Sequence, residues 1–171
     1  FYPWQGKLYY VENYGTHSLA DKEGLYKVGD YYYYARFDSY ETLCNQKVWV
    51  AETNGLLDEN GEPFEVGYYR FDENGRMIIF TGLIEENGLL YYYHNGLLEY
   101  NAGVIEFEGN LYNVGTDGSC WMSKTDYVWK PNGLVPEGYY RFDENGHMIM
   151  TTDVVNENGE YWYYDEGCHV D

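Results

Sequence analysis

The residues of this chain best suited to binding a ligand are tryptophans that stand close to polar groups. Trp49 and Trp129 each follow a valine in the segments VWVAETNGL and VWKPNGLVP, which the sequence predicts as connectors between hairpins. An exposed indole on a connector can stack against the face of a neutral sugar ring, while Asn54, Asn132 or Lys130 bonds the sugar hydroxyls. In the alternative role, which is the commoner one for such residues, each tryptophan pins its connector onto the core. Both roles stay open here.

Trp121, in the segment CWMSKTDYVW beside Lys124, is a further candidate platform, and it has no counterpart elsewhere in the chain.

Groups that could support catalysis or hold a metal are present, but their spacing is uninformative. The sequence DENG begins at Asp58, Asp72 and Asp143, and turn chemistry explains it without the regularly spaced ligands of an EF-hand. No acidic residue lies in a distinctive apolar context that would raise its pKa, as a glycosidase acid requires. We therefore expect no enzymatic activity, no metal and no cofactor.

Net charge narrows the range of partners. The 171 residues contain 10 Lys and Arg against 29 Asp and Glu, a formal net charge of −19. Nucleic acids and anionic lipid surfaces would be repelled, so we expect no nucleic-acid partner. No stretch approaches the roughly 20 apolar residues of a membrane-spanning helix, so membrane insertion is not expected either. Neutral or cationic partners remain.

Aromatic residues dominate the apolar content. The chain has 23 Tyr, 5 Trp and 20 Gly, and no window shows a sustained apolar stripe of helical period. A core built from such rings, each with a polar edge that needs water or a partner, favours an all-β protein.

Internal repeats define the organisation of the chain. GYYRFDENGRMII at 67–79 returns as GYYRFDENGHMIM at 138–150, and an insertion at about 57–63 shifts the register of the upstream copies. Each unit of about 20 residues reads as two short strands around a polar turn. Several Asn-Gly turns, including those in Asp72–Gly75 and Asp143–Gly146, are expected to need positive φ at both central residues. Because a lone hairpin is marginally stable, the hairpins must stack. The sequence predicts an elongated solenoid of stacked β-hairpins, a single repeat array over 1–171 with large units at about 1–80 and 81–171.

Short motifs carry a resemblance to a known family. GEYWYYDEG at 159–167 and GYYRFDENG at 67–75, with a small residue and Gly after the hairpin as in Thr81–Gly82, resemble the cell-wall-binding repeats, which include the choline-binding and glucan-binding repeats of Gram-positive surface proteins. The resemblance implies a hairpin solenoid, a secreted or cell-surface location, and non-catalytic attachment to a wall polymer or glycan.

The resemblance also implies where ligands would bind. In choline-binding repeats a Trp after the inter-hairpin Gly, the first aromatic residue of the next strand and a neighbouring ring form a cage for a quaternary ammonium. Here the residue after that Gly is aliphatic: Leu25, Leu83, Val104 and Val154. The first-aromatic positions that are kept are Tyr31, Tyr68, Tyr139 and Tyr161.

We therefore expect a carbohydrate-binding or wall-binding module that uses exposed aromatic residues, with a choline-like cation as an alternative ligand. The rival hypothesis is a structural spacer or stalk that has lost its ligand cages and contacts a protein partner.

Overall fold

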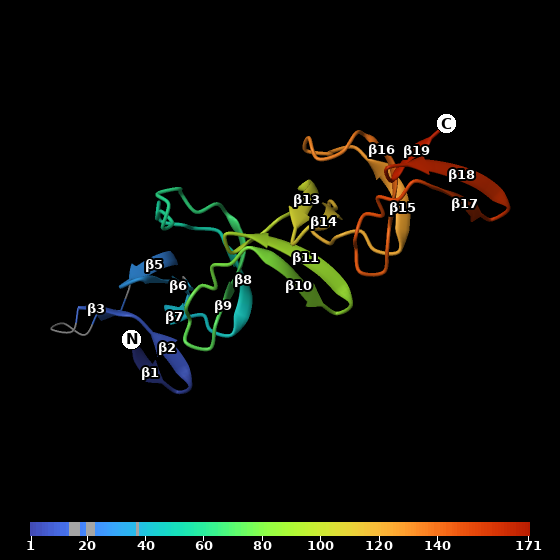
Figure 1. Cartoon of the computed structure of the whole chain (residues 1–171). Helices are drawn as coiled ribbons and strands as arrows, with labels where there is room; N and C mark the ends of the chain where they lie inside the picture. Colours follow the sequence, from blue (N-terminus) through green and yellow to red (C-terminus); the bar gives the residue numbers. More distant parts are fainter. Residues whose placement is uncertain (14–17, 20–22, 37) are drawn as a thin grey trace. The chain divides into compact units, whose positions relative to one another are not determined.

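The computed structural model describes residues 1–13, 18–19, 23–36 and 38–171. These residues form strands and turns and no helix, which confirms the all-β prediction. In the same part of the chain, therefore, no helix is present that could span a membrane. The chain divides into two compact units (Figure 1): unit 1 comprises Phe1–Phe80 and Asn95–Leu98, and unit 2 comprises Thr81–His94 and Glu99–Asp171.

Unit 1 contains a five-stranded antiparallel sheet and a separate long-loop hairpin. The sheet has the order β1-β2-β7-β6-β5, because the two-residue strand β7 pairs with both β2 and β6 and so joins two hairpins that the sequence predicts as separate. The strands of unit 1 are β1 (Tyr2–Trp4), β2 (Lys7–Tyr9), β3 (Val11–Asn13), β4 (Ser18–Leu19), β5 (Gly24–Val28), β6 (Tyr31–Ala35), β7 (Glu41–Thr42), β8 (Gln46–Val50), β9 (Gly67–Phe71) and β12 (Leu97–Leu98).

Unit 2 is built from successive antiparallel hairpins. The pairs are β10 with β11, β13 with β14, β15 with β16, and β17 with β18, to which β19 adds a third strand. Their bounds are β10 (Gly82–Glu86), β11 (Leu89–His94), β13 (Gly103–Phe107), β14 (Asn110–Val114), β15 (Lys124–Val128), β16 (Gly138–Phe142), β17 (Asp153–Glu157), β18 (Glu160–Asp165) and β19 (Cys168–Val170). Adjacent hairpins share apolar cores, as in the cluster of Leu90 from β11 with Tyr112 and Val114 from β14.

Alternation along the Gly-Tyr-Tyr-Arg-Phe strands explains why so many tyrosines are tolerated. In β9 and β16 the second tyrosine, Tyr69 or Tyr140, is buried, while the first faces outward. Each buried hydroxyl donates a hydrogen bond to a backbone carbonyl four residues earlier, Tyr69 to Glu65 at 2.9 Å and Tyr140 to Pro136 at 3.0 Å. The ring fills the core and its polar end is satisfied.

The DENG turns differ from the sequence prediction. At Asn74 and Asn145 the φ angle is not positive, so only Gly75 and Gly146 are left-handed there. The Asp72 carboxylate accepts hydrogen bonds from the backbone N–H groups of Asn74 and Arg76, and this Asx-type geometry sets the turn instead. Both central residues are left-handed at several tight hairpin turns, such as Asn87–Gly88, whereas at the β5–β6 turn only Gly29 is.

The insertion at 57–63 is one more copy of this turn. Leu57 bridges to Pro63, and the Asp58 carboxylate accepts hydrogen bonds from the N–H groups of Asn60 and Glu62 at 2.8 and 2.9 Å. The extra residues thus form a closed turn within the loop between β8 and β9.

Candidate functional site

The outward face of the β8–β9 hairpin carries a pair of aromatic rings. Trp49 lies within strand β8, directly opposite Tyr68 of β9, rather than in a connector as the sequence predicts. The two rings meet edge to face, with centroids 5.0 Å apart and an interplanar angle of 74°. Trp49 is 48% exposed, so it lies on the hairpin surface and not in the core.

The β15–β16 hairpin repeats this pair with a different residue. Tyr127 stands opposite Tyr139, at a centroid distance of 5.1 Å and an angle of 86°. Tyr127 is therefore the structural counterpart of Trp49, and the sequence match of Trp49 to Trp129 is out of register by two residues. The aligned burial confirms this register, because Val50 and Val128 are both fully buried and both face the strand-opening glycine.

Trp129 follows β15 directly and extends the pair into a row. Its ring lies 4.2 Å from that of Tyr127, at 44°, and the side chain is 75% exposed. An indole exposed to this extent does not pin its loop onto the core, which is the role that the sequence favours for it. We call Tyr139, Tyr127 and Trp129 the aromatic row.

A surface pocket opens beside this row within unit 2, with a volume of about 240 Å³. We call it the Trp121–Trp129 pocket, and the side chains that matter in it are Trp121, Tyr127, Trp129, Lys124, Lys130 and Asn113. Trp121 packs edge-on against Phe142 at 5.4 Å, which holds it half-buried at the pocket wall. The structure thus brings two of the predicted tryptophans together with a tyrosine that sequence reasoning missed.

The lysines of the pocket are held by neighbours. Lys124 Nζ lies 4.5 Å from the Trp121 ring centroid and 2.7 Å from the Asp126 carboxylate. The hydrogen bond from Lys124 is the main reason that the pKa of Asp126 lies below its ordinary value. Lys130 Nζ donates a hydrogen bond to the carbonyl of Asn101 at 3.0 Å.

The asparagines proposed to bond sugar hydroxyls have a structural role. The Asn132 amide donates to the carbonyls of Ala102 and Val104, at 2.7 and 2.8 Å. Asn54 does the same in unit 1 with the carbonyls of Glu23 and Leu25. These amides fasten each long loop to the preceding hairpin, and the φ angles of 53° and 55° explain why asparagine suits both positions.

The other predicted residues belong to other hairpins than the aromatic row. Tyr31 is 46% exposed and lies under the Arg76 guanidinium, 4.1 Å from its ring centroid. Tyr68 has Lys47 Nζ at 5.6 Å as well as Trp49. Tyr161 is 75% exposed on β18. No pocket described here includes these three residues.

Aliphatic residues occupy the positions at which a choline-binding repeat has the tryptophan of its cage. Leu25 and Val104 are buried in the cores of their hairpins, where they form no exposed wall. Leu83 is half-buried, and Val154 is exposed but aliphatic. None of the four supplies the electron-rich ring face that attracts a quaternary ammonium.

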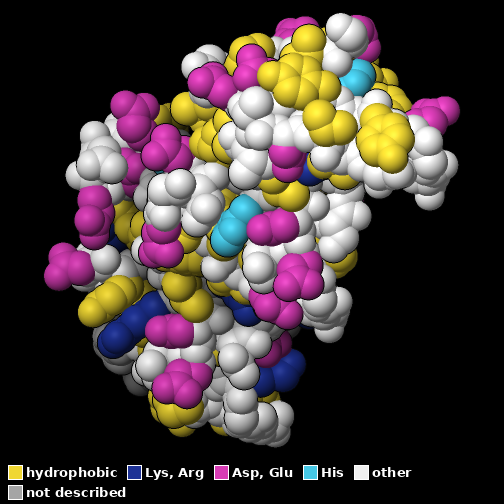
Figure 2. Space-filling view, turned by 45° about the vertical axis from the view of Figure 1, so that its right-hand side comes forward, with side chains coloured by type: hydrophobic (Ala, Val, Ile, Leu, Met, Phe, Trp, Pro, Cys, Tyr) yellow, Lys and Arg dark blue, Asp and Glu magenta, His cyan; other side chains and the backbone are white. Residues whose placement is uncertain are grey.

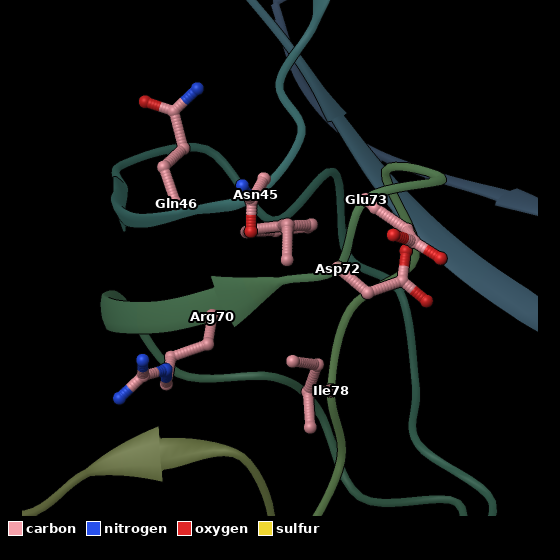
Figure 3. A pocket seen from close by; sticks show the side chains of 7 residues that line it. Asn45, Gln46, Arg70, Asp72, Glu73 and Ile78 are labelled. Carbon is pink, nitrogen blue, oxygen red and sulfur yellow. The ribbon is translucent and has the colours of Figure 1, made fainter.

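A second pocket, in unit 1, has a different chemistry. It has a volume of about 330 Å³ and is lined by Arg70 of β9 and by Asp72 and Glu73 of the following turn (Figure 3). Its lining contains no exposed ring on which a sugar could stack. Across the described residues, no three His, Cys, Asp or Glu side chains gather in a way that could hold a metal ion.

Comparison with solved structures relates this architecture to known proteins. A crystal structure of choline binding protein F from Streptococcus pneumoniae is similar with a TM-score of 0.61 and 21% identity, over 99% of this chain and 64% of that one. A structure of CbpF in complex with ipratropium gives a TM-score of 0.60 and 20% identity, over 99% and 66%. This chain therefore spans slightly less than two thirds of their length. Neither a protein-family model nor a curated protein sequence matches it. The chain has the hairpin-repeat fold of the choline-binding proteins, as its resemblance to the cell-wall-binding repeats predicted.

Proposed function

We propose that this chain is a non-catalytic repeat module of a secreted or surface protein, which attaches to a glycan or cell-wall polymer through exposed aromatic residues. The observation that carries the proposal is the aromatic row, in which Trp129 is 75% exposed and backed by Tyr127 and Tyr139. Rings that pack against one another on a β-hairpin provide an apolar surface that loses little conformational entropy when a sugar ring stacks on the exposed indole.

The fold supports a wall-binding role, because the similar solved protein is named for binding choline. The geometry favours a sugar over choline, since aliphatic residues stand where the cage tryptophan would be. The absence of a catalytic role is part of the proposal. Among the described residues, the carboxyl groups with a displaced pKa are Asp58, Asp117 and Asp126, and each pKa is displaced downward, the opposite of what a general acid needs at neutral pH.

Retention on purified Gram-positive cell walls tests the proposal, together with a glycan array that includes peptidoglycan fragments and choline, read by intrinsic tryptophan fluorescence. Wild-type protein is expected to be retained and Trp129→Ala to be lost from the walls. Tyr161→Ala is the matched control, because Tyr161 is equally exposed, at 75%, but lies outside the aromatic row. A blank result with folded wild-type protein would refute the proposal and favour a structural stalk or a protein partner.

A further inference from the structure

The charge of the Trp121–Trp129 pocket is opposite to that of the chain around it. Its lining contains two lysines and no carboxylate, whereas three other surface pockets in the described part of the chain each include an acidic residue: Asp72 and Glu73 in the pocket of Figure 3, Glu73 in another and Asp117 in the third. Figure 2 shows acidic side chains spread over the visible face, with hydrophobic side chains exposed among them. A pocket without acids is therefore a distinctive feature of a chain that carries 29 of them.

The scarcity of basic residues strengthens this point. Residues 81–171 contain only three Lys or Arg, namely Lys124, Lys130 and Arg141. Arg141 is committed elsewhere, since its guanidinium pairs with Asp153 at 2.6 Å and lies over the Tyr164 ring at 4.1 Å. The two remaining cations line the same pocket.

Of these two ammonium groups, Lys130 is the one whose positive charge is not neutralised by a neighbouring carboxylate among the described residues. Lys124 is paired with Asp126, and its charge also acts on Asp117, so nearby carboxylates offset it. Lys130 donates to a neutral carbonyl, and no ion pair is recorded for it in the described part of the chain. An ammonium group has three donors, so two remain for a ligand.

Polar and apolar groups converge in the pocket as a sugar site requires. The rings of Trp121, Tyr127 and Trp129 form the apolar part of the lining, and Asn113, which is only 4% exposed, lines the same space. A volume of about 240 Å³ is below the range of drug-sized pockets, roughly 300–1,000 Å³, and suits a single ring.

We propose that this pocket binds a saccharide residue that carries a carboxylate, with its ring on the aromatic side chains and its carboxylate at Lys130. The inference rests on the proposed function and narrows its ligand class. A cationic ligand such as choline is disfavoured here, because it would approach two ammonium groups. The rest of the acidic surface repels an anionic polymer, so the preference for a carboxylate is confined to this pocket. Salt should weaken the attraction between Lys130 and the carboxylate.

The test compares two tetrasaccharides of equal length, one of N-acetylglucosamine alone and one alternating glucuronic acid with N-acetylglucosamine. Titration calorimetry and tryptophan fluorescence are recorded at low and high ionic strength. The acidic tetrasaccharide is expected to bind more tightly at low salt, and Lys130→Gln should weaken its binding roughly two- to fivefold, which is more than it weakens binding of the neutral tetrasaccharide. Lys47→Gln is the control, because Lys47 also lies over an aromatic ring but belongs to unit 1.

Three results would overturn the inference. Equal binding of both sugars with no effect of Lys130→Gln would refute it and leave a neutral-sugar module intact. If Lys130→Gln and Lys47→Gln weakened binding of the acidic tetrasaccharide equally, the effect would come from the overall charge of the protein and not from a site at Lys130. Binding of neither sugar by folded protein would also refute it, and the proposed function would then be decided separately by retention on whole cell walls.

Discussion

Trp49 and Tyr127 occupy the same position in two hairpins, each opposite the first tyrosine of a Gly-Tyr-Tyr strand and each edge-on to that tyrosine's ring. In unit 2 the tryptophan of the repeated Val-Trp pair, Trp129, lies two positions later, in the loop after β15. The aromatic surface of that hairpin therefore extends beyond its strands, whereas in unit 1 it ends at the Trp49–Tyr68 pair. Because of this difference, we expect unit 2 to contribute more to glycan binding than unit 1.

The first prediction concerns this inequality. Trp129→Ala should change the free energy of unfolding by less than about 0.5 kcal/mol, because the ring is 75% exposed. It should weaken glycan binding by at least about fivefold, as expected for an aromatic anchor worth more than ~1 kcal/mol. Trp49→Ala should have the smaller effect on binding. Urea unfolding and fluorescence titration measure both quantities, and a larger loss with Trp49→Ala would contradict the assignment of the site to unit 2.

The second prediction concerns the loop that carries Lys130. Asn132→Asp keeps the size of the side chain and tolerates the left-handed backbone, but it cannot donate to the carbonyls of Ala102 and Val104. Two lost hydrogen bonds should lower the free energy of unfolding by about 1–3 kcal/mol in urea denaturation at neutral pH. Asn158→Asp is the matched control, since Asn158 has a similar φ of 54° at an exposed hairpin tip. Equal stability of the two variants would show that the amide does not fasten the loop.

The architecture was predictable from the sequence because short-range interactions determine it, and the residues that make them recur in each repeat. Glycines, paired tyrosines and Asn-Gly turns favour hairpins, and the return of the 67–79 segment at 138–150 with only two residues changed predicts the same structure twice. The role of Asp58 was equally local, since a DENG turn forms its own hydrogen bonds.

The site was harder to predict because it depends on strand register. The repeated Val-Trp pair suggests that Trp129 corresponds to Trp49. Strand pairing shows instead that Tyr127 does, and Tyr127 was missed for that reason. Counting back from Asn54 and Asn132 to the buried Val50 and Val128 gives the correct register, so the signal was present. By contrast, nothing local indicates that Trp121, with no counterpart in the repeats, faces the same pocket as Trp129.

The third prediction concerns a tight contact at the start of β9. A methyl group added at Gly67 would collide with Cδ1 at the end of the Leu97 side chain, so Gly67→Ala should destabilise unit 1 by about 1 kcal/mol, the low end of the range for overpacking. Leu97→Ala makes room for the methyl group, and the double variant should be more stable than the sum of the two single effects implies. A double-mutant cycle by urea unfolding measures this coupling. Strict additivity would show that the two side chains do not compete for the same space.

The fourth prediction concerns acid stability. Hydrogen bonds from the backbone N–H groups of Glu62 and Asn60, and from the Asn95 amide at 2.6 Å, hold the pKa of Asp58 below its ordinary value of about 3.9. Because the folded-state pKa is the lower one, this carboxylate stabilises the fold fully above pH ~4, and the contribution is lost as pH falls through the folded value. The free energy of unfolding of the wild type should therefore drop between pH 6 and pH 3 by more than that of Asp58→Asn, in which this titration is absent. Asp30→Asn, at the exposed turn between β5 and β6, removes the same charge elsewhere in unit 1 and is the control. If Asp58→Asn and the wild type lost stability in parallel, the turn would not depend on the charge of this carboxylate.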